Sequence, residues 1–425
     1  MNPRLRALLG TYTNSCRDEE NPRYRNTQRS TPGTSHFHRV SPVPILYGRP
    51  REKVLGIIRP SMRALTRVML TGLVLGAQAS TALAQEQINF AVDLTFYGDN
   101  TEFFNPWREG ETLLGTEGRF FLDVDLNEHV TLRGGVFGNH RTGADNSFET
   151  VRPVLALHVK NEFTRFIIGS LESGIRKVGA GPDHQGPHGL LPPLQRESLS
   201  FSRPDEAGLQ WTFDLDRFEQ ETWINWQQLN TSEAREAFDA GMRGRVGLGS
   251  ALPVWFSYQF HVVHTGGQLF DSGPVGDSWS GGPGFIIDLP TGGIFDNQSA
   301  EVHGLVARDV PDRAALDDNG ETGFGLFTRY AAEKSGWRAH LIAWRARDFI
   351  KREGDLNYSS LREDGNLTRL RHYFETGLTR TYYPAKEVGL EFSARFHRID
   401  THHDYSYRIL AKVDLGIPIP VPGRP

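Results

Sequence analysis

The chain has 425 residues, of which 38% are hydrophobic, 11% are aromatic and 45 are Gly, and its one cysteine is Cys16. The cysteine count excludes a disulfide framework and a Cys-ligated metal centre. Residues 1–84 hold 13 basic and 4 acidic residues, so subtraction from totals of 47 and 51 leaves a remainder with 34 and 47 and a net charge of −13, which argues against nucleic-acid binding.

Residues 62–84 are predicted to be a secretory signal peptide. A basic start, a short apolar segment at 68–76 and the cleavage site Ala82-Leu83-Ala84 follow one another in order. The apolar segment is shorter than the about 20 residues that a helix needs to cross a bilayer. Residues 1–61 are rich in Arg and Pro and show no sustained period. We interpret these residues as an artefact of a wrongly assigned gene start or, alternatively, as a disordered extension.

From Ile88 onward, apolar and polar residues alternate with a period of two. The last strand is an example, with seven apolar positions in strict alternation from Tyr405 to Ile417. Several alternations run for ten residues or more, whereas a globular strand is usually about 5–6 residues long. Ten residues suffice to cross a bilayer at a tilt. Since backbone groups in lipid have no water to bond, such strands must close into a barrel, and this favours a transmembrane barrel over a secreted β-sandwich.

The connections between these strands are alternately short and long. Two of the long ones cover 172–206 and 349–369. This asymmetry predicts short periplasmic turns and long extracellular loops in an all-β, antiparallel barrel at residues 85–417. For all short connections to lie on one side of the membrane and all long ones on the other, two further strands are needed, around Gly284–Leu289 and Ile294–Arg308. The barrel then has 16 strands. If the whole region 266–321 is instead one outer loop, the count is 14.

In this pattern, residues 85–417 resemble bacterial outer-membrane porins and related barrels. The resemblance implies the outer membrane of a Gram-negative bacterium, reached after cleavage near Ala84, and as partners the barrel assembly machinery, outer-membrane lipid and lipopolysaccharide. A homo-oligomer is compatible with it. Such barrels usually end on an aromatic residue, whereas residues 418–425 are Pro-rich. We expect these residues to form a periplasmic tail, because proline cannot extend a strand ladder.

Aromatic residues cluster near the predicted strand ends. They include Phe103, Phe104, Trp107, Trp223 and Trp226. Aromatic girdles at both membrane interfaces are usual in outer-membrane barrels, so we expect these side chains to face the interfaces.

Charged residues of both signs lie in the middle of the polar strand faces. On a lipid face each Arg or Lys would cost about 2–4 kcal/mol, so these charges must face a lumen. The residues expected to line a pore are Asp93, Glu117, Arg119, Asp123, Arg133, Glu221, Arg338, Glu391, Arg395, Arg408 and Lys412. A modest excess of acids favours cations. The alternative is that these charges pair across strands and plug a narrow barrel.

The Gly- and Pro-rich segment 173–203 is too irregular for regular structure and unusually long for a loop. We expect it to fold into the lumen as a constriction or lid. The residues that it offers for this role are Asp183, His184, His188 and Arg196. Its acid and histidines could bind a metal, but further ligands are not identifiable, so neither a metal nor another cofactor is predicted.

No enzymatic activity is predicted. The motifs G-x-S-x-G and H-E-x-x-H are absent, and Ser393 and His397 share one strand face but lie roughly 13 Å apart along the strand. The leading hypothesis is a porin-like channel for passive diffusion of small hydrophilic solutes, with a mild cation preference. The alternatives are a channel dedicated to a polysaccharide or another specific solute and gated by residues 173–203, and a non-conducting structural barrel.

Overall fold

The computed structural model describes residues 87–420 except 147, 175–185, 250–252, 290–292 and 316–320. The predicted extension and signal peptide lie outside the described residues. Within the described part, no helix has both the length and the apolar character needed to cross a membrane. The strands are β1 (Gln87–Phe104), β2 (Glu109–Asp125), β3 (Val130–Arg141), β4 (Thr150–Lys160), β5 (Thr164–Ser170), β6 (Ala207–Leu215), β7 (Phe218–Gln228), β8 (Glu236–Gly247), β9 (Val254–Gly266), β10 (Gly276–Asp288), β11 (Asn297–Val310), β12 (Glu321–Lys334), β13 (Trp337–Arg347), β14 (Leu370–Ala385), β15 (Val388–Ile399) and β16 (His402–Ile419).

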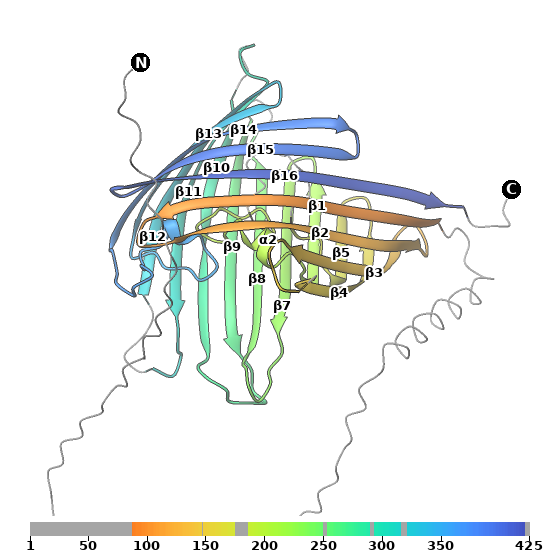
Figure 1. Cartoon of the computed structure of the whole chain (residues 1–425), viewed down its shortest axis with the longest axis horizontal. Coiled ribbons are helices and arrows are strands. Elements are labelled where there is room, and N and C mark those ends of the chain that lie inside the picture. The colour runs from red at the N-terminus through yellow and green to blue at the C-terminus, as the bar shows by residue number, and fades with distance from the viewer. Residues whose placement is uncertain are drawn as a thin grey trace, which may run out of the picture. The chain divides into compact units, whose positions relative to one another are not determined.

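These strands form one closed antiparallel barrel in which each strand pairs with its neighbours in sequence. The barrel closes where β1 pairs with β16, from Ile88 opposite Ile419 to Glu102 opposite Tyr405, and Figure 1 shows these two strands side by side. The predicted barrel of 16 strands is therefore confirmed, and the alternative count of 14 is wrong.

An even number of strands puts the beginning of β1 and the end of β16 at the same end of the barrel. The short turns 161–163, 216–217 and 335–336 lie at that end, and the longest connections, 171–206 and 348–369, lie at the other. This is the arrangement of outer-membrane barrels, in which the short turns are periplasmic and the long loops extracellular.

The period-two pattern separates a lipid face from an interior. On β16, Tyr405, Tyr407 and Ile409 are about half exposed, whereas Ser406 and Arg408 between them are buried. Successive side chains of a strand point to opposite sides of the sheet. The apolar set therefore faces outward, and the polar set faces the inside of the barrel.

The largest differences between predicted and observed strand boundaries lie within 266–321, the region for which the sequence left the strand count undecided. β10 begins at Gly276, eight residues before the predicted Gly284, and β11 begins at Asn297 rather than Ile294. The pattern at 276–284 is Gly-rich and lacks apolar alternation. Backbone pairing with β9 nevertheless extends over it, from Gly276 opposite Thr265.

The last strand runs two residues beyond its predicted end, to Ile419, and includes Pro418 opposite Asn89 of β1. The expectation that the proline segment could not join the ladder is wrong at this position. β15 pairs with β16 only as far as Val413. At Pro418, therefore, the edge of β16 that faces β15 has no strand to pair with. Proline is tolerated in a strand where it has no backbone partner to bond.

The expected girdles form only in part. Phe104 and Trp226 are 73% and 45% exposed, but Phe103, Trp107 and Trp223 are buried inside. Phe103 and Phe104 are neighbours on β1, and neighbouring strand residues alternate between the two faces, so only one of the two can lie on the lipid side.

Candidate functional site

Two of the extracellular connections fold into the barrel. The β5–β6 connection contains the short helix α2 (Leu199–Ser202), and the β13–β14 connection contains the 3-10 turn η2 (Leu356–Tyr358). We call their described parts the first inward segment, 186–206, and the second inward segment, 348–369. Their buried apolar residues share one cluster with wall residues such as Trp344. The apolar residues that they contribute to it are Leu190, Leu191, Leu194, Phe349 and Tyr358.

The two inward segments are tied to each other by backbone and side-chain bonds. The backbone N–H of Arg196 donates to the Glu353 carbonyl at 2.7 Å, and that of Asp355 donates to the Pro192 carbonyl at 2.8 Å. Arg203 forms an ion pair with the Glu353 carboxylate. The segments therefore form one packed body inside the extracellular half of the barrel.

Glu197 anchors the first inward segment to the last two strands. One of its carboxylate oxygens lies 2.8 Å from Arg395 Nη1 and 2.7 Å from Arg408 Nη2. Burial alone would raise the pKa of this carboxyl, but the two guanidinium groups outweigh it and lower the pKa to about 2. Glu197 is therefore ionised at any pH at which the barrel would work.

His188 anchors the same segment to the opposite part of the wall. Its Nε2 lies 2.7 Å from Glu206 Oε2, its Nδ1 lies 2.7 Å from Glu221 Oε1, and its ring stacks on Trp223 at 3.8 Å between centroids. Burial would lower the pKa of the imidazole, but the charges and hydrogen bonds of Glu206 and Glu221 raise it to about 9. His188 is thus a buried cation held between two carboxylates.

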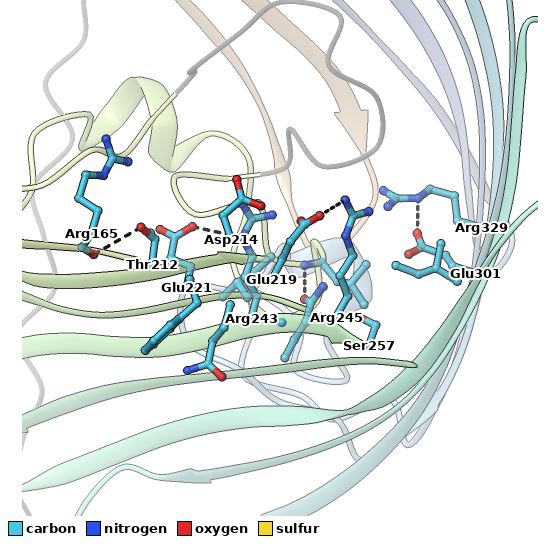
Figure 2. A pocket seen from close by; sticks show the side chains of 18 residues that line it. Arg165, Thr212, Asp214, Glu219, Glu221, Arg243, Arg245, Ser257, Glu301 and Arg329 are labelled. Carbon is cyan, nitrogen blue, oxygen red and sulfur yellow. Dashed lines mark hydrogen bonds and ion pairs between the residues drawn. The ribbon is translucent and has the colours of Figure 1, made fainter. Parts of the chain in front are cut away.

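A polar chamber of about 260 Å³ lies below the first inward segment. Leu190 and Leu191 border the chamber on the side of that segment, and Asp214 and Glu219 flank the periplasmic turn 216–217 on the other. Figure 2 shows Glu219 of β7 and Arg245 of β8 directed at each other, and these two residues are paired on neighbouring strands of the chamber wall, with 2.6 Å between Glu219 Oε1 and Arg245 Nη2. The chamber therefore presents charges of both signs.

Further charged residues of the chamber wall are also paired. Arg243 Nε lies 3.3 Å from Glu221 Oε2, and Arg329 forms an ion pair with Glu301 (Figure 2). Gln259 is uncharged, and its side-chain oxygen accepts a hydrogen bond from the backbone N–H of Leu191 at 2.8 Å. The chamber wall is therefore polar, with acids and bases that balance each other. It is bonded to the first inward segment through Gln259.

A second polar group lies near the extracellular rim, on β14, β15 and β16. His397 Nε2 lies 2.8 Å from Ser406 Oγ, and His397 Nδ1 lies 2.7 Å from the Tyr373 hydroxyl. Tyr373 donates to Glu375 Oε2 at 2.5 Å. Because the Tyr373 hydroxyl donates its proton to Glu375, it accepts a hydrogen bond from Nδ1–H of His397. Nε2 of His397 is then unprotonated and accepts a hydrogen bond from the Ser406 hydroxyl. We call these four residues the relay.

The strand register brings the relay together. Glu375 on β14 is directly opposite His397 on β15, and Arg395, two residues before His397, is directly opposite Ser406 on β16. The serine faces a cavity of about 30 Å³, which is room for about one water molecule. A serine hydroxyl bonded to an oriented histidine is the arrangement that nucleophilic catalysis uses.

The eleven residues expected to line a pore all lie on the inward faces of their strands. Several of them pair across strands, as the plugged alternative requires: Arg133 lies 2.7 Å from Asp123, and Lys412 lies 2.8 Å from Asp93 across the β1–β16 seam. Arg408 lies 2.9 Å from Asp99 across the same seam. The pore-lining role of these residues stays a prediction.

Of the four residues expected in the constriction, two are described. His188 and Arg196 lie in the first inward segment, and Asp183 and His184 lie outside the described residues. Three residues outside the predicted set have a geometry closer to that of a metal site. One ligand atom from each of Asp239, His261 and Glu353 lies within 4.8 Å of the others. Arg203 already pairs with Glu353, so this cluster does not depend on an ion for its charge.

The relay is not evident from the sequence pattern. Ser393 lies four residues before His397 on the same strand face, whereas the serine that bonds His397 is Ser406 on the next strand. A signal was available, because His397 lies just before the turn between β15 and β16 and Ser406 lies just after it. Strands that pair through a tight turn place such positions close together.

Similar folds occur among solved outer-membrane proteins. OprD from Pseudomonas aeruginosa is 12% identical with a TM-score of 0.42 over 80% of this chain and 96% of that one. The loop L8 deletion mutant of OmpT from Vibrio cholerae is 9% identical with a TM-score of 0.46, over 78% and 100%. OccAB4 from Acinetobacter baumannii is 10% identical with a TM-score of 0.41, over 79% and 100%.

At the level of sequence, a search of curated proteins found none that matches the chain. One family does match. The sequence profile of the family described as lipid A 3'-O-deacylase-type covers residues 78–417, which is the whole barrel except the last two residues of β16. The chain therefore belongs to the lipid A 3'-O-deacylase-type family.

Proposed function

We propose that the protein is an outer-membrane channel dedicated to a small polar solute, which binds in the polar chamber and whose passage is gated by the two inward segments. The chamber carries this proposal, because it is a formed, charged space inside the barrel whose lining extends from residues beside the periplasmic turn 216–217 to Leu190 and Leu191 of the first inward segment. The passive, open pore of the leading sequence hypothesis is less well supported, since the extracellular half is packed.

The chamber suggests the size and chemistry of the solute. Its volume of about 260 Å³ corresponds to about nine waters at roughly 30 Å³ each, which suits an amino acid or a monosaccharide. Its four arginines, Arg165, Arg243, Arg245 and Arg329, face an equal number of acids in the wall. A solute with both charge signs, or one rich in hydroxyls, can replace such contacts. A mild cation preference remains a prediction.

Planar-bilayer conductance tests the gating. The folded barrel should show rare, small openings, and a variant in which a short Gly-Ser linker replaces residues 187–203 should conduct steadily. The matched control shortens the exposed connection 230–234, which should leave conductance unchanged. Migration on unheated gels checks that each variant is folded. Glu353→Gln, which removes the ion pair to Arg203, is a milder variant that should raise the open fraction.

Solute selectivity is tested by swelling of liposomes that contain the loop-replaced barrel. Amino acids and monosaccharides should enter, and Arg243→Gln should alter the rate for amino acids more than for sugars. A folded, loop-replaced barrel that neither conducts nor admits any solute would refute the channel proposal.

A second candidate function is hydrolysis of an acyl ester, which the relay and the family both favour. The family description names removal of an O-linked acyl chain. In this reaction Ser406 Oγ attacks the ester carbonyl while His397 takes its proton and passes it to the leaving alcohol, and water then releases the fatty acid. Tyr373 and Glu375 orient His397. The site would have to open, because its cavity holds about one water.

Release of fatty acid from lipid A in mixed micelles tests this candidate. Ser406→Ala should abolish release if the relay is catalytic. Ser393→Ala is a matched control, since Ser393 is a buried inward serine on β15 without a hydrogen-bond partner among the described residues. Release that is absent from the native barrel, or equal in both variants, would remove the hydrolase candidate while leaving the channel test untouched.

A further inference from the structure

The charges of the polar chamber are not all used by the protein itself. Of its four arginines, Arg165 and Arg245 each lie 2.6 Å from a carboxylate oxygen. Arg329 forms an ion pair with Glu301, and both of these side chains are buried. The fourth arginine, Arg243, is more weakly held, and its unused donors help to decide which solute the chamber can bind.

Arg243 of β8 is bonded at one end only. Its Nε lies 3.3 Å from Glu221 Oε2, and its two terminal nitrogens donate no hydrogen bond to any residue that the structure describes. The other oxygen of Glu221 accepts a bond from Gln210 and contacts His188, both at 2.7 Å. The Arg243 side chain is 31% exposed, so a planar fork of donors is available to a carboxylate in the chamber.

Asp214 of β6 is the matching unused acid. Its backbone N–H donates to the Phe163 carbonyl at 2.9 Å, but within the described part of the chain its carboxylate has no hydrogen bond and no ion pair. It is exposed, lines the chamber and lies directly opposite Glu219, whose own carboxylate is held by Arg245. An ionised carboxylate can only accept hydrogen bonds, so Asp214 is suited to an ammonium group.

The strand register places these two unused groups within reach of one small solute. Glu221, which faces Arg243 on β7, is two residues from Glu219, which faces Asp214 on β6. The Arg243 guanidinium reaches over β7, so it lies about one strand, roughly 4.8 Å, from β6 and about 7 Å along the strands from Asp214. An amino acid with a hydrogen bond of about 2.8 Å at each end spans a gap of this order. Figure 2 shows both side chains on the chamber wall.

We propose that the chamber binds a zwitterion of the amino-acid type, with its carboxylate on the terminal nitrogens of Arg243 and its ammonium on Asp214. The proposal rests on the channel function, because it identifies the solute of that channel. A monosaccharide offers only neutral hydroxyls and would leave both charges without a counter-charge, which is costly in a partly dry site. Asp214 lies two residues from the periplasmic turn 216–217, so the ammonium end of the solute faces the periplasm.

Equilibrium dialysis of the folded, detergent-purified native barrel against radiolabelled probes tests the two contacts separately. The probes are alanine, propionate, which lacks the ammonium, alaninamide, which lacks the carboxylate, and glucose. Alanine should bind most tightly. Arg243→Gln should weaken alanine and propionate about tenfold, which corresponds to about 1.4 kcal/mol, and leave alaninamide unchanged. Asp214→Asn should weaken alanine and alaninamide to a similar extent and leave propionate unchanged.

Asp216→Asn is the matched control, because Asp216 is an exposed acid of the neighbouring turn and does not line the chamber. It should bind all four probes as the native barrel does, and migration on unheated gels shows that each variant is folded. Three results would overturn the proposal: no binding of alanine, binding of glucose as tight as that of alanine, or equal effects of both substitutions on propionate and alaninamide. Conductance is not measured here, so a barrel that admits sugars but does not bind alanine would lose this proposal and keep the channel function.

Discussion

His188 holds the first inward segment to the wall through its charge, so this anchor should weaken at high pH. The pKa of His188 is raised to about 9 in the folded protein because Glu206 and Glu221 stabilise the imidazolium against the opposing effect of burial. An unperturbed histidine has a pKa of about 6.5. The folded state therefore binds more protons than the unfolded state between these two values. Its contribution to the free energy of unfolding is full below about pH 6.5 and is lost as pH rises through 9.

The size of the effect follows from the shift. One pKa unit corresponds to about 1.4 kcal/mol, so a shift from 6.5 to about 9 amounts to about 3 kcal/mol. His188 is buried, so solvent screening does not reduce this value as it would for an exposed group. Loss of 3 kcal/mol is large compared with the total stability of about 5–15 kcal/mol of a typical protein.

The assay compares the native barrel with His188→Gln, which keeps a polar side chain but cannot be protonated. Urea unfolding in detergent gives the free energy of unfolding at pH values from 6 to 10, and hydrogen exchange reports on the amides of 187–206 in the same samples. The difference between the two proteins should shrink by about 3 kcal/mol over this range. His129→Gln, in the exposed turn 126–129, is the control and should not change the profile.

A difference that stays constant from pH 6 to pH 10 would refute the reasoning. It would mean that His188 is neutral in the folded barrel and that its contacts with Glu206 and Glu221 are ordinary hydrogen bonds. In that case the inward segment would be held mainly by its apolar residues, and pH would not act on it through this histidine.

Three further predictions concern the anchors and the lipid face. Glu197→Gln should destabilise the barrel by about 3–5 kcal/mol in urea unfolding, because Arg395 and Arg408 lose their buried partner; since the pKa of Glu197 is lowered to about 2, the native anchor should persist on acidification and be lost only as pH falls through that value. Phe201→Ala should cost about 3–5 kcal/mol in the same assay, as this side chain is 1% exposed within an apolar cluster. Leu378→Arg, on the lipid face at 49% exposure, should cost about 2–4 kcal/mol of folding free energy in bilayers.

Much of the fold could be predicted because alternation and length depend on single strands. The seven alternating apolar positions of the last strand identify its lipid face without reference to any neighbour. Strand ends could not be predicted in the same way. Gly276 and Pro418 join the ladder because a partner strand extends past them, and a single-strand pattern carries no information about its partner's length.

The site was less predictable for the same reason. Long, Gly- and Pro-rich composition pointed to 173–203 as a segment with a special role, but not to the carboxylates that would hold His188. Glu206 lies 18 residues away from it and Glu221 lies 33 residues away. The relay depends on register as well: a shift of one residue between β15 and β16 would put Ser406 on the lipid face and leave His397 without its partner.

The position of the relay has a consequence for assembly. Ser406, His397 and the two arginines that hold Glu197 all belong to the final hairpin, β15–β16, and the same hairpin closes the barrel against β1. Contacts such as Lys412 with Asp93 join residues more than 300 positions apart, and such distant contacts form late in folding. A chain without its last hairpin would therefore lack the seam, the relay and the Glu197 anchor together, so barrel closure and completion of this site are a single event.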